Sequence, residues 1–165
     1  MIFYSEEKFI DNDSSIKLIN LISEKNLKPN YTNFERSSIG YEFDLTNSQN
    51  KILSEVKLKI INLISSLYKE KVFCNNCWIS ISPPETKVIR HNHKDNDDVK
   101  YSSIIYLKVP KKSGILKIET IKLNPKNGLF LLFNSECNHE VDVNKSSDDR
   151  ICLALDFSIT KQQLK

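Results

Sequence analysis

The sequence predicts an α+β fold in which N-terminal helices support a double-stranded β-helix, or jelly roll. Two observations lead to this prediction. The strongest helical pattern lies before residue 70, whereas from Val72 onward apolar residues recur at every second position. This second region contains a series of short strand candidates separated by Pro, Gly, Asn and Ser, which is typical of a double-sheet barrel.

The size and charge of the chain set its broad class. With 165 residues, we expect a single domain over residues 1–165, with mainly helical support in 1–70 and the jelly-roll core in 71–160. The 24 basic and 21 acidic side chains are mixed along the chain, so nucleic acid is not an expected partner. The N-terminus lacks the pattern of a signal peptide, and no apolar run approaches the ~20 residues that span a bilayer. We therefore expect a cytoplasmic protein without a membrane partner.

The N-terminal part contains two predicted helices. Ser14 and Ser15 are predicted to cap a first helix that runs to about Glu24. Residues 26–33 are predicted to form a loop, and residues 39–45 an edge strand. Residues 46–69 give the clearest helix, because apolar residues follow each other at steps of three and four. This stripe consists of Leu53, Val56, Ile60, Leu63, Ile64 and Leu67.

The C-terminal part is predicted to consist of strands. Each candidate alternates or is rich in β-branched and aromatic residues, and each is bounded by turn residues. The predicted strands are residues 78–82, 87–91, 101–109, 115–119, 128–133, 139–143 and 150–157.

The cysteines fit a reducing compartment as free thiols. Cys74 and Cys77 form a Cys-x-x-Cys motif, but no second such pair is present to complete a zinc site. A redox motif would open a helix, whereas the sequence after Cys77 is predicted to be a strand. A structural role is therefore favoured for these thiols over a metal or redox role.

All three histidines of the chain lie at predicted strand edges. His91 and His93 are separated by one residue, so in an extended segment they share a face about 7 Å apart. His139 lies near a later strand and could complete a facial set on a barrel. Imidazole suits Fe, Zn, Cu and Ni, and three ligands would leave positions open for catalysis. The alternative is that the three are loop or surface histidines.

Arg150 begins a predicted strand with two different faces. Ile151, Leu153, Leu155 and Phe157 form the apolar face, and Arg150, Cys152, Ala154 and Asp156 form the other. Small neighbours beside an inward arginine leave room for a ligand, and a guanidinium binds a carboxylate in bidentate fashion. The alternative is a surface arginine paired with Asp148 or Asp149.

These segments together resemble the Fe(II)- and 2-oxoglutarate-dependent dioxygenases, in particular their prolyl-hydroxylase-like branch. The resemblance extends over about 80 residues, from Trp78 to Phe157, in matching order and spacing. The matching segments are His91-Asn-His93, Tyr101 to Leu107, Ser113 to Ile118, Leu123 to Phe133, Asn138 to Val141 and Arg150 to Leu155.

The resemblance implies a role for each matching residue. His91 and His139 would be iron ligands, and Arg150 would pair with the far carboxylate of 2-oxoglutarate. Tyr106 would hydrogen-bond the same carboxylate, although it is equally well explained as a packed core aromatic. The implied reaction consumes dioxygen and 2-oxoglutarate and hydroxylates a substrate, for example a prolyl or other amino-acid C–H bond. No catalytic residue beyond the metal site is expected.

His93 departs from the family pattern, which is His-x-Asp. A neutral imidazole in place of the carboxylate raises the net charge of the site by one unit. Either His93 is a ligand in a three-histidine site, which we favour, or the site is impaired and His93 stands beside the metal.

Two other functions compete with a dioxygenase. A cupin-type metalloprotein also uses His-x-His but needs a nearby glutamate, and the next one here is Glu119. A non-catalytic metal-binding jelly roll would consume neither 2-oxoglutarate nor dioxygen. The loops at residues 30–40 and 94–100 are expected to flank the site, but they do not identify the substrate.

Overall fold

A computed structural model of the chain describes residues 2–24, 27–28, 40–94 and 98–160. The two helices in this part are α1 (Asn12–Glu24) and α2 (Lys51–Tyr68). The strands are β1 (Ile2–Glu6), β2 (Tyr41–Asp44), β3 (Lys71–Ser82), β4 (Val88–His91), β5 (Tyr101–Lys108), β6 (Leu116–Ile118), β7 (Ile121–Leu123), β8 (Phe130–Asn134), β9 (His139–Val141) and β10 (Arg150–Thr160).

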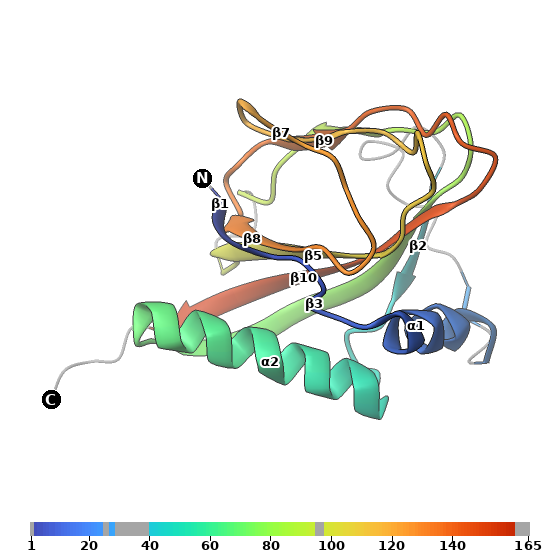
Figure 1. Cartoon of the computed structure of the whole chain (residues 1–165). Helices are drawn as coiled ribbons and strands as arrows, with labels where there is room; N and C mark the ends of the chain where they lie inside the picture. Colours follow the sequence, from blue (N-terminus) through green and yellow to red (C-terminus); the bar gives the residue numbers. More distant parts are fainter. Residues whose placement is uncertain (1, 25–26, 29–39, 95–97, 161–165) are drawn as a thin grey trace, which may run out of the picture.

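The strands form two antiparallel sheets that face each other (Figure 1). The larger has six strands in the order β1-β8-β5-β10-β3-β2, and the smaller has four in the order β4-β9-β6-β7. Both helices lie against the outer face of the larger sheet (Figure 1). The predicted jelly roll with supporting helices is therefore confirmed. Neither described helix combines the length and apolar character needed to cross a membrane.

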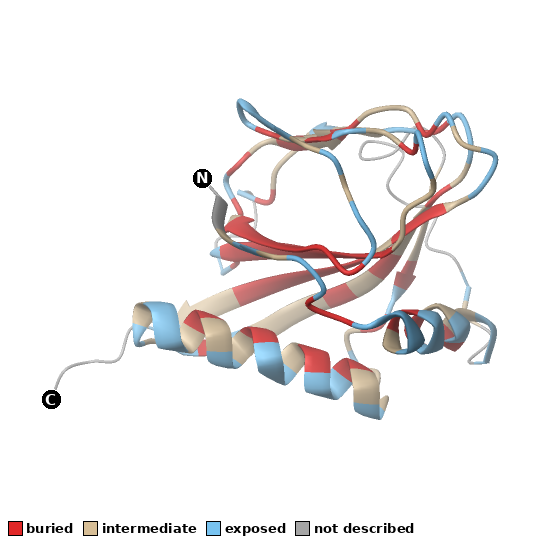
Figure 2. Ribbon diagram, viewed as in Figure 1, coloured by how far each residue is buried: buried red, intermediate tan, exposed pale blue. Residues whose placement is uncertain are grey.

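The buried residues are marked in red in Figure 2. Their apolar side chains form two separate groups. One group fills the space between the helices and the larger sheet and includes Leu18, Leu53 and Leu153. The other lies between the two sheets and includes Tyr106 and Phe133. Because β5 and β10 are central strands, one face of each packs on the helices and the other faces the smaller sheet.

Both helices begin at different residues from those predicted. Asp11, rather than Ser14 or Ser15, caps α1, because its side-chain Oδ1 accepts from the Ser14 backbone N–H at 2.7 Å. In α2 the cap is Asn50, whose side chain accepts from the Leu53 N–H, so residues 46–49 precede the helix. The predicted stripe packs on the sheet, except that Leu67 is 48% exposed.

Two strands were missed by the sequence pattern. The strand β1 pairs with β8 at the sheet edge, where backbone pairing rather than an apolar pattern defines it. The strand β7 forms a hairpin with β6 in which three residues of each strand are paired. Glu119 takes the left-handed conformation at that turn (φ 51°), although Gly or Asn is the usual residue there. The predicted edge strand at residues 39–45 is β2, and most of the predicted loop at residues 26–33 lies outside the described residues.

The cysteines are free thiols. Cys74 and Cys77 both lie in the interior of β3, which begins at Lys71 and so starts before the strand predicted at residues 78–82. Burial raises the pKa of Cys74 to about 11 and that of Cys77 to about 12, so both remain protonated at neutral pH. A protonated thiol in a strand is a poor metal ligand and a poor nucleophile.

Candidate active site

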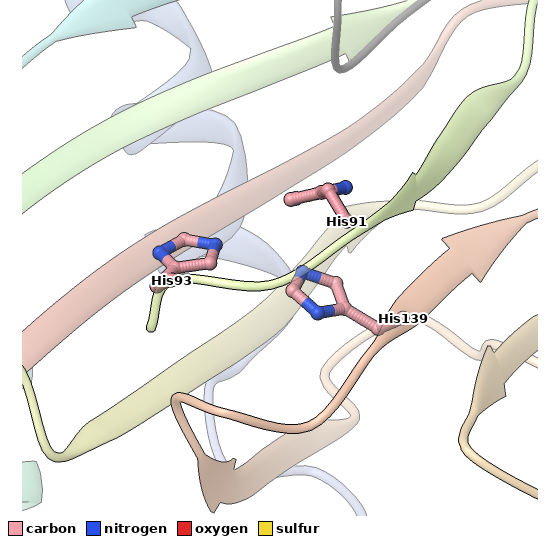
Figure 3. Close-up of side chains that lie close together, drawn as sticks. All are labelled: His91, His93 and His139. Carbon is pink, nitrogen blue, oxygen red and sulfur yellow. The ribbon is translucent and has the colours of Figure 1, made fainter. Parts of the chain in front are cut away.

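The fold brings the three histidines together at one end of the space between the sheets. His91 ends β4, and the register of the smaller sheet places it directly opposite His139 at the start of β9. His93 follows β4 by two residues, and its backbone N–H donates to the Ser135 carbonyl at 2.8 Å. One ligand nitrogen from each histidine lies within 4.8 Å of the others (Figure 3).

Hydrogen bonds set the tautomer of each imidazole. The Nδ1 atoms of His91 and His139 lie 2.8 and 3.1 Å from the backbone carbonyl oxygens of Ile89 and Cys137. The Nδ1 of His93 lies 2.9 Å from the Asp156 Oδ2. All three partners are oxygen acceptors, so each Nδ1 carries a proton, and in the tautomer with a single ring proton the lone pair is at Nε2.

The rings are also held by packing. His93 and His139 are buried, with 7% and 6% of their surface exposed. Trp78 stacks on the His93 ring with centroids 6.1 Å apart, and Phe133 meets the His139 ring edge-on at 5.0 Å. A ligand set that is oriented before binding loses little conformational freedom on taking up an ion.

A cavity extends from the histidines along the inner face of the larger sheet. Its wall alternates in the way predicted for β10, because Arg150, Cys152, Ala154 and Asp156 all line it. The other lining residues are Glu42, Trp78, Ser80, Ser82, Val88, His91, His93, Ser102, Ser103, Ile104, Tyr106, Phe133, His139 and Val141.

Arg150 is a buried cation with neutral partners. It is 2% exposed, so the alternative of a surface arginine does not apply. Its guanidinium donates to the backbone carbonyl of Ser113, to that of Asp142 at 3.5 Å, and to the Ser82 hydroxyl at 3.0 Å. None of the ion pairs among the described residues includes it.

Gly114 contributes to the position of this arginine. It has φ +99°, and a Cβ there would collide with the Asp142 carbonyl and the Arg150 guanidinium. The glycine therefore allows the chain to pass close to the Arg150 guanidinium.

Tyr106 lies beside Arg150 in the cavity wall. It is 1% exposed and is opposite Cys152 in the pairing of β5 with β10. Burial raises the pKa of the Tyr106 phenol far above its usual value, Cys152 raises it further, and the Arg150 guanidinium opposes this shift. The phenol therefore stays neutral and keeps a proton that it can donate.

Sequence reasoning missed two members of the site, Asp156 and Ser102. The two oxygens of Asp156 accept from the His93 ring and from the Ser102 hydroxyl, the latter at 2.7 Å. The available signal was the charge of Asp156 itself, since an acidic residue on an inward strand face requires a partner. Of the loops expected at the site entrance, residues 30–39 and 95–97 lie outside the described residues.

The donor set fits a single transition-metal ion. Histidine nitrogens bind such ions at about 2.0–2.1 Å, so two of them on one ion are at most about 4.2 Å apart. The observed limit of 4.8 Å therefore requires only a small inward movement of the rings. Among the described residues no glutamate of the kind that a cupin site needs joins this cluster, and Glu119 is half-exposed and pairs with Arg90 at 3.2 Å.

The fold is similar to that of several solved hydroxylases. A chlorella virus collagen prolyl hydroxylase, solved with 2-oxoglutarate, superposes with a TM-score of 0.79 over 95% of this chain and 96% of its own, at 16% identity. A Pseudomonas putida prolyl-4-hydroxylase gives 0.74 over 94% and 91%, at 19% identity. A Trichoplax adhaerens prolyl hydroxylase gives 0.72 over 94% and 82%, also at 19% identity. The fold is that of the prolyl-hydroxylase-like 2-oxoglutarate oxygenases.

The family follows from the sequence itself. The model of the aspartyl/asparaginyl beta-hydroxylase family matches residues 27–159, which is most of the chain. The protein belongs to this family. A search of curated proteins found no match.

Proposed function

We propose that this protein is an Fe(II)- and 2-oxoglutarate-dependent hydroxylase with a three-histidine iron site. One observation supports the proposal above all others: a convergent histidine set and a buried arginine with no acidic partner among the described residues line the same cavity. Metal ion and dicarboxylate would each find a complementary group there.

In this proposal His91, His93 and His139 bind iron through their Nε2 atoms. The Nδ1 contacts of the three rings fix this tautomer before the metal arrives. His93 replaces the usual carboxylate, and its burial against Trp78 supports a role as a ligand rather than as a bystander.

Arg150 and Tyr106 are proposed to bind the far carboxylate of 2-oxoglutarate. The guanidinium would form a charge-assisted pair, and the neutral phenol would donate a further hydrogen bond. Among the described residues this buried cation is held by carbonyl and hydroxyl groups, and it gains more from such a partner than an exposed cation would.

With iron and 2-oxoglutarate bound, the chemistry supplied is oxidative decarboxylation by dioxygen, which releases succinate and carbon dioxide and hydroxylates a substrate C–H bond. The residues of the chain hold the cosubstrate in one orientation and limit the access of water. The apolar walls formed by Val88, Ile104, Phe133 and Val141 serve the second purpose.

The proposed substrate is an amino-acid residue of a peptide or protein. The matched family is named for aspartyl and asparaginyl hydroxylation, and the similar structures for prolyl hydroxylation, one of them solved with a peptide fragment. The free thiols Cys74, Cys77, Cys137 and Cys152 fit a reducing compartment, and we place the activity in the cytoplasm.

The decisive experiment is an anaerobic titration of metal-free protein with Fe(II) and then 2-oxoglutarate. We expect a visible metal-to-ligand charge-transfer band that is lost or strongly weakened in Arg150→Ala. Lys126→Ala is the matched control, because it removes an exposed cation outside the cavity lining. Succinate release with added peptides would then identify the substrate.

Each other outcome has a definite meaning. Iron binding without the band would favour a cupin-type metalloprotein over a 2-oxoglutarate enzyme. Metal binding without turnover of 2-oxoglutarate or dioxygen would indicate a non-catalytic binding module. Failure to bind iron would overturn the histidine site altogether.

A further inference from the structure

Asp156 is a buried carboxylate to which the proposed function assigns no role. It lies on the inward face of β10 and is 4% exposed. Each of its oxygens accepts one hydrogen bond, Oδ2 from His93 Nδ1 at 2.9 Å and Oδ1 from the Ser102 hydroxyl at 2.7 Å. Burying a carboxylate is costly unless it is paired, so this arrangement calls for an explanation beyond packing.

The backbone directs this side chain toward His93. In the pairing with β5, Asp156 is directly opposite Ser102. In the pairing with β3, the register shifts between Asp156 and Phe157, so that Asn75 has no opposite residue on β10. The extra residue is on β3, so the bulge bends β3 beside Asp156.

His93 differs from the other two histidines in its Nδ1 partner. His91 and His139 each face a neutral backbone carbonyl, whereas His93 faces a carboxylate. A carboxylate acceptor makes the opposite nitrogen of the ring a stronger donor to a metal. The one imidazole at the position where the family pattern has Asp is thus the one backed by an acidic side chain.

The charge count supports the same conclusion. Fe(II) with two histidines and one carboxylate carries a formal charge of 2 − 1 = +1. Fe(II) with three neutral histidines carries +2, and Asp156 brings the total of the buried group back to +1. In this chain the negative charge lies on Asp156, which contacts the ligand His93, and not on the ligand itself.

We propose that Asp156 is a positioning residue that acts through His93 and supplies the negative charge that a carboxylate ligand would otherwise contribute. Ser102 orients Asp156 for this purpose. The proposal rests on the three-histidine iron site of the proposed function. It adds to that site a carboxylate behind one of the ligands.

The first test compares Asp156→Asn with the native protein by anaerobic Fe(II) titration. Asparagine keeps the size and one acceptor oxygen but removes the charge. We expect the Kd for Fe(II) to rise by about 10- to 100-fold, which is the usual effect of removing such a group behind a ligand. Asp148→Asn is the control for charge, since Asp148 is exposed and pairs with Lys108. Asp156→Glu, which keeps the charge, should retain more affinity than Asp156→Asn.

A spectroscopic measurement distinguishes the loss of the Asp156 charge from a structural change at the site. With 2-oxoglutarate bound, the charge-transfer band of Asp156→Asn should move to shorter wavelength, because a less electron-rich iron gives up an electron less readily. A merely structural loss would reduce the amplitude of the band without this shift.

The second test repeats the substitution in a His93→Asp background. There the new carboxylate supplies the negative charge at the ligand itself, and no imidazole remains through which Asp156 could act. Asp156→Asn should therefore raise the Kd for Fe(II) much less in His93→Asp than in the native background. An equal rise in both backgrounds would be expected if Asp156 only maintained the fold.

The outcomes distinguish this proposal from the one on which it rests. Equal iron affinity in the native protein and Asp156→Asn, or an equal loss of affinity in both backgrounds, would overturn the role of Asp156 alone. Absence of iron binding in the native protein would overturn the histidine site, and the role of Asp156 with it.

Discussion

The two charged ends of the cavity differ in how their charge is balanced. At the histidine end, Asp156 is paired with His93 and Ser102 inside the protein. At the other end, the partners of the Arg150 cation in the part of the chain that the structure describes are two carbonyls and one hydroxyl. Buried charges are stable when they are paired, so the first end is complete without a ligand and the second becomes complete when a carboxylate binds. The comparison indicates one preformed binding site and one that depends on its ligand for stability.

The largest expected effect is on stabilisation by the ligand. With Mn(II) as a redox-stable substitute for iron, 2-oxoglutarate at 100 times its Kd should stabilise the native protein by about 2.7 kcal/mol, seen as a rise in Tm. Arg150→Ala should lose this rise, whereas Lys126→Ala should keep it. Asp156→Asn should also keep it once the metal concentration is raised to saturation. A full rise in Arg150→Ala would show that the two ends do not differ as described.

A smaller effect is expected for Tyr106→Phe. A hydrogen bond to a charged group contributes about 1.5–3 kcal/mol, so removing the phenol should weaken 2-oxoglutarate binding by about tenfold or more. The Kd for the metal should not change, because Tyr106 belongs to the arginine end. Isothermal titration with each component would measure both values. An unchanged Kd for 2-oxoglutarate would identify Tyr106 as a core aromatic, the alternative that the sequence left open.

The smallest effect is expected on the alkylation rate of Cys152, which lies on β10 between Arg150 and Asp156. Burial raises the pKa of this thiol to about 11, while the Arg150 guanidinium lowers it. Alkylation, followed by peptide mass spectrometry, should therefore be slow at pH 7.5 and become about tenfold faster with each pH unit up to about 11. Arg150→Ala should slow the reaction further, by a few-fold, because the thiolate loses its nearby cation. Asp156→Asn should leave the rate unchanged, and a rate that is independent of pH would contradict the assignment.

The accuracy of the sequence predictions followed the length and regularity of each element. The central strands β5 and β10 and the helix α2 have strong periodicity, and all three were predicted, although the start of α2 was placed too early. The short strands β1 and β7 were missed, because pairing with a neighbour, and not their own pattern, makes them strands. The caps Asp11 and Asn50 were missed because several polar residues near each helix start were equally suitable.

The sequence alone determined which side chains point inward. The alternation along β10 placed Arg150, Cys152 and Asp156 on one face, and the His-x-His spacing placed two imidazoles on another, since both follow from local backbone geometry. The tertiary structure decided what those side chains meet. His93 and Asp156 are 63 positions apart, and Ser102 and Asp156 are 54 apart, so their contacts depend on strand order, register and a bulge. Local sequence specifies a strand and its faces, but only the completed sheets bring a carboxylate behind one particular histidine.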